Sequence, residues 1–123
     1  MKTLVVGPKG TIGKQVVKLL KEKGHEIIEA SRSTNPSLDI TNPSNIESFY
    51  ANLGEVDAII CEAGEAAFTF LNKASDDQIQ LGIKSKLLGQ VNLVRKGLNN
   101  LRTGGVFIIT GGILAYSPIP QTS

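Results

Sequence analysis

The sequence has little cysteine, no tryptophan and no long apolar run, and these absences exclude several classes of protein. Its 123 residues include one cysteine, Cys61, which cannot form an internal disulfide and fits a reducing compartment. No apolar run approaches the length of a membrane span, and too few apolar residues follow Met1 and Lys2 for a signal peptide. The sequence therefore predicts a cytoplasmic protein with no membrane partner.

An excess of one charge is also absent. Thirteen basic residues face 11 acidic ones, which gives a net charge of +2, and the basic residues are scattered along the chain. A nucleic-acid-binding surface would need them clustered, so we expect no nucleic-acid partner. The chain is long enough for one hydrophobic core, and its sequence shows no internal repeats. Residues 1–123 are therefore predicted to form a single domain.

What the sequence does have is a strand, a glycine loop and a helix over residues 3–24. Three glycines at a spacing of three follow an apolar run, and apolar residues then recur at helical spacing until Gly24. A dinucleotide site needs this order, because a residue without a Cβ lets the backbone approach a pyrophosphate at a helix N-terminus. The alternative is a glycine-rich turn that binds nothing. The predicted cofactor contacts in this loop are Gly7, Lys9, Gly10, Thr11, Ile12 and Gly13.

The loop after the second predicted strand indicates which cofactor would bind. In dinucleotide folds an acid there favours NAD, whereas an arginine with small hydroxyl neighbours suits the additional phosphate of NADP. The acid is absent here, and Arg32 lies between Ser31 and Ser33, with Lys9 as a second nearby cation. The sequence favours NADP over NAD; the alternative is that Arg32 is a solvated loop residue.

Strands and helices alternate along the rest of the chain. Asn42 and Pro43 begin a helix that ends near Leu53, and a capping box from Ser75 to Gln78 opens the longest helix, which runs to about Leu101. The predicted strands are residues 3–6, 26–30, 37–40, 56–61 and 106–110. This order predicts an α/β fold, a doubly wound, Rossmann-like parallel sheet in three layers with strand order 3-2-1-4-5.

Two features predict contact with another surface. Gly82, Gly89 and Gly97 lie inside the longest helix, where glycine reduces stability, so we expect the sheet or a second subunit to come close to them. The strand over residues 106–110 is expected to be buried on both faces yet lies at the sheet edge, which invites pairing. We expect more chain after Ser123 or a homo-oligomer. The apolar stripe expected on this helix is Ile79, Ile83, Leu87, Val91, Val94, Leu98 and Leu101.

Taken together, these motifs resemble the amino-terminal part of the short-chain dehydrogenase/reductase family. The glycine triplet matches the cofactor glycines of that family, in the spacing of its extended and atypical members. Further matches are residues 39–40 after the third strand, 61–64 at the Asn-Asn-Ala-Gly position, 86–89 on the long helix and 107–112 before the catalytic serine. The resemblance implies that Asp39 and Ile40 contact the adenine and that Cys61, Ala63 and Gly64 line the cofactor site.

The same resemblance leaves the catalytic residues unknown. The family uses a Tyr, a Lys, a Ser and an Asn for hydride transfer. Gly112 occupies the Ser position and Lys86 the Asn position, while the Tyr-x-x-x-Lys motif would fall beyond Ser123. Lys86 could contact a phosphate or an acidic substrate, or pair with Glu62.

Other polar residues give weaker indications. Glu62 and Glu65 could act as acid and base, although a solvated loop is the simpler interpretation. Cys61 is expected to be structural rather than nucleophilic, His25 is expected at the surface, and no metal site is expected. Three hypotheses remain: an NADP-dependent oxidoreductase with a small-molecule substrate, a non-catalytic NAD(P)-binding sensor or regulatory module, and a domain that binds nothing.

Overall fold

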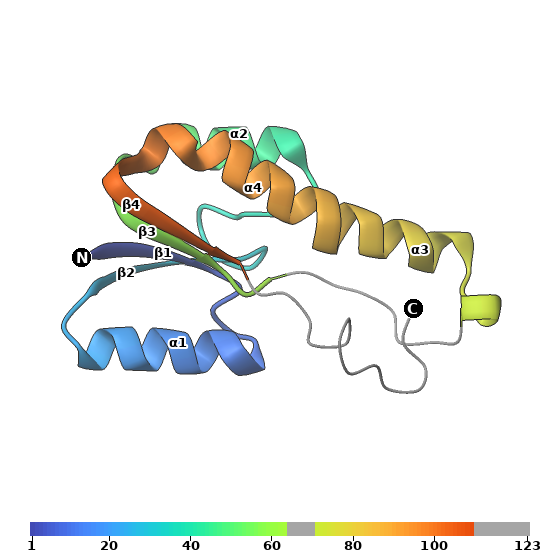
Figure 1. Ribbon diagram of the computed structural model, residues 1–123, viewed down its shortest axis with the longest axis horizontal. Coiled ribbons are helices and arrows are strands. Elements are labelled where there is room, and N and C mark those ends of the chain that lie inside the picture. Colours follow the sequence, from blue (N-terminus) through green and yellow to red (C-terminus); the bar gives the residue numbers. More distant parts are fainter. Residues whose placement is uncertain (64–70, 110–123) are drawn as a thin grey trace.

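The computed structural model describes residues 1–63 and 71–109, in which four parallel strands form one sheet between helices (Figure 1). Helix α1 (Thr11–Glu22) covers one face, and α2 (Pro43–Ala51) and α4 (Gln90–Gly97) cover the other. The strands, in the sheet order β2-β1-β3-β4, are β2 (Glu26–Ala30), β1 (Lys2–Val6), β3 (Val56–Cys61) and β4 (Leu101–Ile109). The predicted Rossmann-like fold with helices on both faces is confirmed.

The third predicted strand is wrong. Residues 37–40 form a loop whose backbone groups bond outside the sheet. The Leu38 amide donates to the Ser31 carbonyl at 2.9 Å, and the Asn45 side chain binds backbone groups on either side of Leu38. Leu38 and Ile40 are nevertheless buried in the core. The apolar side chains of these two residues indicated burial, and a loop can bury them as well as a strand can. The order of the observed strands in the sheet is the predicted order without this third strand.

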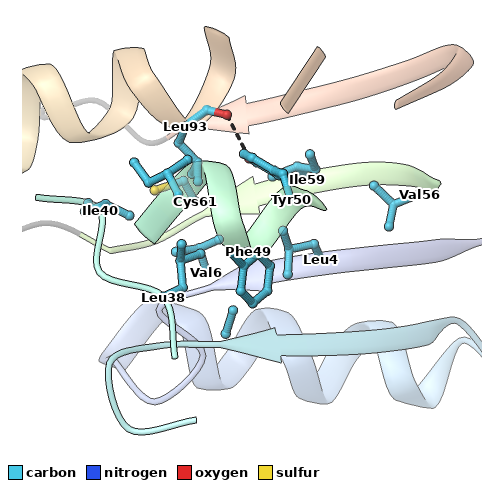
Figure 2. Packing of buried hydrophobic residues seen from close by; sticks show 12 residues of the cluster. Leu4, Val6, Leu38, Ile40, Phe49, Tyr50, Val56, Ile59, Cys61 and Leu93 are labelled. Carbon is cyan, nitrogen blue, oxygen red and sulfur yellow. Dashed lines mark hydrogen bonds between the residues drawn. The ribbon is translucent and has the colours of Figure 1, made fainter. Parts of the chain in front are cut away.

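The core lies between the sheet and the helices α2 and α4 (Figure 2). The phenol of Tyr50 on α2 donates a 2.7 Å hydrogen bond to the Leu93 carbonyl on α4, and burial raises the pKa of Tyr50. Phe49 packs edge-to-face on the Tyr50 ring at 6.3 Å between centroids. The buried cluster is Leu4, Val6, Ala30, Leu38, Ile40, Ile46, Phe49, Tyr50, Val56, Ile59, Cys61 and Leu93.

The longest predicted helix exists but is not uniform. It comprises α3 (Asp76–Gly82), the π-helical segment η2 (Ile83–Gly89), α4 and the 3₁₀ turn η3 (Leu98–Asn100). The predicted capping box at its start is present, with both of its hydrogen bonds. Its end is one residue early, because Leu101 already belongs to β4.

The face of this helix that packs on the core is the opposite of the predicted one. Most of the expected apolar stripe is exposed, and the buried residues are Ser85, Gly89, Leu93 and Gly97. A Cβ on Gly89 would lie 2.9 Å from the Ile40 side chain, and one on Gly97 would lie 2.6 Å from the hydroxyl oxygen of Tyr50. The predicted close approach is therefore real at these two glycines, but core side chains make it.

Strand β4 starts earlier than predicted and is more exposed. It pairs with β3 from Leu101, and an irregularity in register separates that pair from the pairing of Val106 with Ala58. Val106 and Ile108 are each 45% exposed, so the expected burial on both faces is wrong for them. Within residues 1–63 and 71–109, no helix has the length and apolar character needed to cross a membrane.

Candidate functional site

A cleft of about 360 Å³ opens where β1 and β2 end. Crevices beyond the carboxyl ends of parallel strands are where open α/β sheets bind ligands. Segments from five parts of the chain meet around it, including the glycine loop, the loop after β2 and the long helix. The described residues that line it are Val6, Gly7, Gly10, Ser31, Arg32, Leu38, Asp39, Ile40, Thr41, Glu62, Ala63, Leu81 and Ser85.

The three loop glycines have different structural roles. Gly7 has a φ of +82°, and a Cβ there would lie 2.7 Å from the Ala63 amide nitrogen. A Cβ on Gly13 would overlap the carbonyl oxygen of Gly7. Gly10 is different, since the nearest described atom to its Cβ position is 3.8 Å away, an ordinary contact. The fold thus requires glycine at the first and third positions, whereas the second faces the cleft.

Gly10 is also the N-cap of α1, and no side chain caps this helix. There is no acidic residue in its first turn either. The amide groups and the positive dipole end of α1 are therefore available for an anion beside the cleft. Thr11 and Ile12 are exposed in the first turn, outside the set of cleft-lining residues.

Positive charge and hydroxyl groups gather around Ser31 and Arg32, which line the cleft, whereas Lys9 and Ser33 lie beside them and outside the lining. The Lys9 ammonium donates to the Ser33 hydroxyl at 3.4 Å, and the hydroxyl oxygens of Ser31 and Ser33 are 3.0 Å apart. Arg32 lines the cleft, and its carbonyl accepts a 2.9 Å hydrogen bond from the Ser37 hydroxyl. The structure brings together the lysine, arginine and serines that the sequence placed in two separate loops.

Asp39 and Ile40, for which the family resemblance implied contact with an adenine, also line the cleft. The Asp39 carboxylate accepts from the Thr41 amide at 3.0 Å and from the Thr41 hydroxyl at 2.7 Å, which fixes its orientation. Leu81 and Ser85 of the long helix complete this part of the cleft, and the sequence did not reveal them. The capping box predicted where the helix begins in the sequence, but it did not predict which side of the helix faces the cleft.

Cys61 lies in the core rather than in the cleft lining. It is fully buried, and its thiol donates to the Ala63 carbonyl at 3.8 Å. Burial raises the pKa of this thiol, and the positive charge of Lys86 opposes that shift. A buried, protonated thiol is a poor nucleophile, which agrees with the structural role expected for it.

The remaining candidates are dispersed. Glu62 lines the cleft, Lys86 is exposed on η2, and His25 lies 3.3 Å from the amino-terminal nitrogen at the opposite end of the sheet. Gly64, Glu65 and Gly112 lie outside the described residues. In the described ranges no three His, Cys, Asp or Glu side chains gather to hold a metal ion.

Comparison with known proteins decides the family. Residues 3–111 match the model of the NAD-dependent epimerase/dehydratase family. The chain belongs to this family. No curated protein sequence matches this epimerase/dehydratase-family chain.

Solved structures share the fold of this chain, and short-chain dehydrogenases are among them. The protein lin1944 from Listeria innocua is 40% identical with a TM-score of 0.92, over 98% of this chain and 60% of that one. A small-chain dehydrogenase in complex with NADPH is 24% identical (TM-score 0.88, 98% and 55%), and serine dehydrogenase from Escherichia coli is 23% identical (TM-score 0.87, 98% and 66%). The epimerase/dehydratase-family chain thus spans about 60% of the length of these proteins.

Proposed function

We propose that this chain is the NADP-binding part of a short-chain dehydrogenase-type oxidoreductase. The observation that carries the proposal is the cleft that joins Gly10, at the uncapped start of α1, to Arg32. Membership of an NAD-dependent family supports a nicotinamide cofactor, and a structural neighbour in complex with NADPH supports the phosphorylated form. The reaction would be hydride transfer between this cofactor and a carbonyl or alcohol of a small-molecule substrate.

The residues of the cleft fit the parts of the cofactor. The backbone at Gly10 and the start of α1 would hold the pyrophosphate. Lys9 and Arg32, with the hydroxyls of Ser31 and Ser33, would hold the ribose phosphate that distinguishes NADP from NAD. Asp39 and the apolar Ile40 would contact the adenine. The nicotinamide would supply or accept the hydride, and the residues of this chain would bind and orient it.

A non-catalytic NAD(P)-binding sensor is the second candidate. It is favoured by Lys86, which takes the position of the family's relay asparagine and is exposed on η2. Both candidates bind the cofactor in the same cleft, so binding alone does not separate them. Oxidation of NADPH by the protein as it occurs in its host, with a panel of small carbonyl compounds, would favour the enzyme. The presence of a single, buried cysteine, Cys61, supports a cytoplasmic location.

Titration of the chain with NADPH and with NADH, by calorimetry, tests the proposal. We expect tighter binding of NADPH, and Arg32→Asp should weaken it about 10- to 100-fold while changing NADH binding little, because charge-assisted hydrogen bonds to phosphate contribute about 1.5–3 kcal/mol. Lys18→Asp, on an exposed part of α1 away from the cleft, is the control for net charge. Equal loss in both variants, or no binding by the folded chain, would contradict the proposal.

A further inference from the structure

The cleft would accommodate one half of a dinucleotide, and the topology of the sheet places the other half. The cleft joins Gly10, after β1, to Arg32, after β2. Strand β1 pairs with β2 on one side and with β3 on the other. A dinucleotide lies across the crevice where the strand order reverses, so the nicotinamide half would reach the ends of β3 and β4.

One flank of the long helix faces the cleft and α2. Residues about one turn or about three turns apart lie on the same side of a helix. Ser85 lines the cleft, and Lys96, three turns later, pairs with Glu47 on α2. This flank is therefore turned toward the half of the crevice that holds Arg32.

The other flank carries Lys86 and faces β4. Lys86 lies three turns before Gly97, whose Cβ position is 2.9 Å from the Phe107 ring on β4. Gln90, one turn after Lys86, is half-buried on the same flank, whereas Lys86 itself is exposed. Lys86 is therefore placed beside the ends of β3 and β4, with its side chain accessible to a ligand.

The charge of Lys86 reaches the end of β3. Burial raises the pKa of the Cys61 thiol, which ends that strand; the Glu62 carboxylate adds to this rise and the Lys86 ammonium opposes it. In the part of the chain that the structure describes, no ion pair joins Lys86 to Glu62 or to another carboxylate. An ammonium in this position, without an acidic partner in the described ranges, is suited to bind an anion.

We propose that Lys86 binds a negatively charged group of the substrate, which is therefore a small hydroxy or oxo compound that carries a carboxylate or a phosphate. The proposal rests on the proposed function and names its substrate class. In the oxidation, the alcohol carbon would give its hydride to the nicotinamide and the hydroxyl would release its proton, while the anionic group stays bound to Lys86. A lysine is a point charge rather than a planar fork, so both anions suit it. The asparagine that the family has at this position is uncharged, so this preference is a property of this chain.

Calorimetry on the protein as it occurs in its host, saturated with NADPH, tests the anion. Alcohols cannot react with the reduced cofactor, so binding is measured alone. The matched probes are lactate with lactamide, mandelate with mandelamide, and glycerol 3-phosphate with glycerol. We expect the anion of at least one pair to bind about tenfold or more tightly than its neutral partner, because hydrogen bonds to charged groups are the strong ones. A preference within the first two pairs would identify a carboxylate, and one within the third a phosphate.

Two substitutions of Lys86 separate its charge from its shape. Lys86→Met should remove the preference for the anion, and Lys86→Arg should keep most of it. Lys84→Met, an exposed lysine of the same segment η2, is the matched control and should bind as the wild type does. No preference in any pair, or a preference that persists in Lys86→Met, would overturn the proposal.

The two redox states of the cofactor give a second measurement that needs no substrate. The oxidised nicotinamide ring carries a positive charge and the reduced ring does not, so a nearby ammonium should disfavour NADP⁺. Lys86→Met should therefore strengthen NADP⁺ binding about fivefold and change NADPH binding little, as expected for two like charges in a partly solvated site. Lys84→Met should change neither. Equal changes for both redox states would place Lys86 away from the nicotinamide and overturn this inference alone, whereas a wild type that does not bind NADPH would overturn the proposed function as well.

Discussion

At the residue scale, the loop glycines separate what the fold needs from what a ligand needs. Gly7 and Gly13 are explained by the chain itself, because a side chain at either one would collide with backbone. Gly10 has no such explanation among the described atoms, and it faces the cleft. A glycine that the fold does not require, next to an uncapped helix start, is what close approach of a pyrophosphate would select.

This difference predicts opposite outcomes for two alanine variants. Gly10→Ala should leave the free energy of unfolding within about 0.5 kcal/mol of wild type and weaken NADPH binding about tenfold. Gly13→Ala should lower the free energy of unfolding by about 3 kcal/mol or more, because its Cβ meets the Gly7 carbonyl. Urea denaturation and calorimetry measure the two effects. A stable Gly13→Ala, or unaltered NADPH affinity in Gly10→Ala, would show that the glycines do not divide in this way.

The sequence singled out several residues that the structure brings to one cleft, because these residue types suit specific tasks in binding a dinucleotide. Gly7, Gly10, Arg32 and Asp39 all line one cleft, although they come from three separate segments. The sequence did not show which of the loop glycines the fold requires, because that depends on the backbone atoms that lie near each of them. Nor did it show that Cys61 points into the core, since a strand end offers two faces and the pattern does not choose between them.

At the element scale, the strands β1, β2 and β3 match their predicted bounds within one residue, since short apolar runs between glycine-rich loops indicate buried strands. The strand predicted at residues 37–40 is wrong, because the Asn45 side chain, rather than a neighbouring strand, forms hydrogen bonds with the backbone there. The long helix and the capping box at its start were predicted, but the face of the helix that packs on the core was not. Apolar periodicity locates the larger side chains, whereas this helix packs three small residues, Ser85, Gly89 and Gly97, on the core together with Leu93.

Two glycines of the long helix should therefore respond oppositely to alanine. Gly97→Ala should destabilise the protein by about 1–3 kcal/mol, because its Cβ would lie 2.6 Å from the Tyr50 hydroxyl oxygen and 2.9 Å from the Phe107 ring. Gly82→Ala should stabilise it by about 0.5–1 kcal/mol, since no described atom lies within 4 Å of its Cβ position and alanine favours helix. Thermal and urea denaturation measure both. Equal effects would mean that intrinsic helix propensity, rather than packing, determines the response.

On the scale of the whole molecule, the two ends of the sheet differ in chemistry. The carboxyl end holds the cleft, whereas the amino end holds a charged network that ties three strands together. Asp57 on β3 accepts from the Lys2 amide on β1 at 2.7 Å and from the Arg102 guanidinium on β4 at 3.1 and 3.2 Å. Glu55 accepts from the same guanidinium at 3.3 Å. The network fixes the start of β4, where its register with β3 is irregular.

This network should make stability depend on acid. The Lys2 amide, with a smaller contribution from Arg102, holds the pKa of Asp57 below its usual value. A carboxyl whose pKa is lower in the folded than in the unfolded state stabilises the fold above its unfolded pKa, near 4, and loses that contribution as the pH falls through its folded value. The melting temperature of the wild type should therefore fall below about pH 4, and Asp57→Asn should lower it at neutral pH and flatten this acid dependence. Glu22→Gln, which replaces an exposed carboxyl at the end of α1, is the control and should keep the wild-type slope. An unchanged slope in Asp57→Asn would place the acid sensitivity elsewhere and leave the charged network with no measurable part in holding β4.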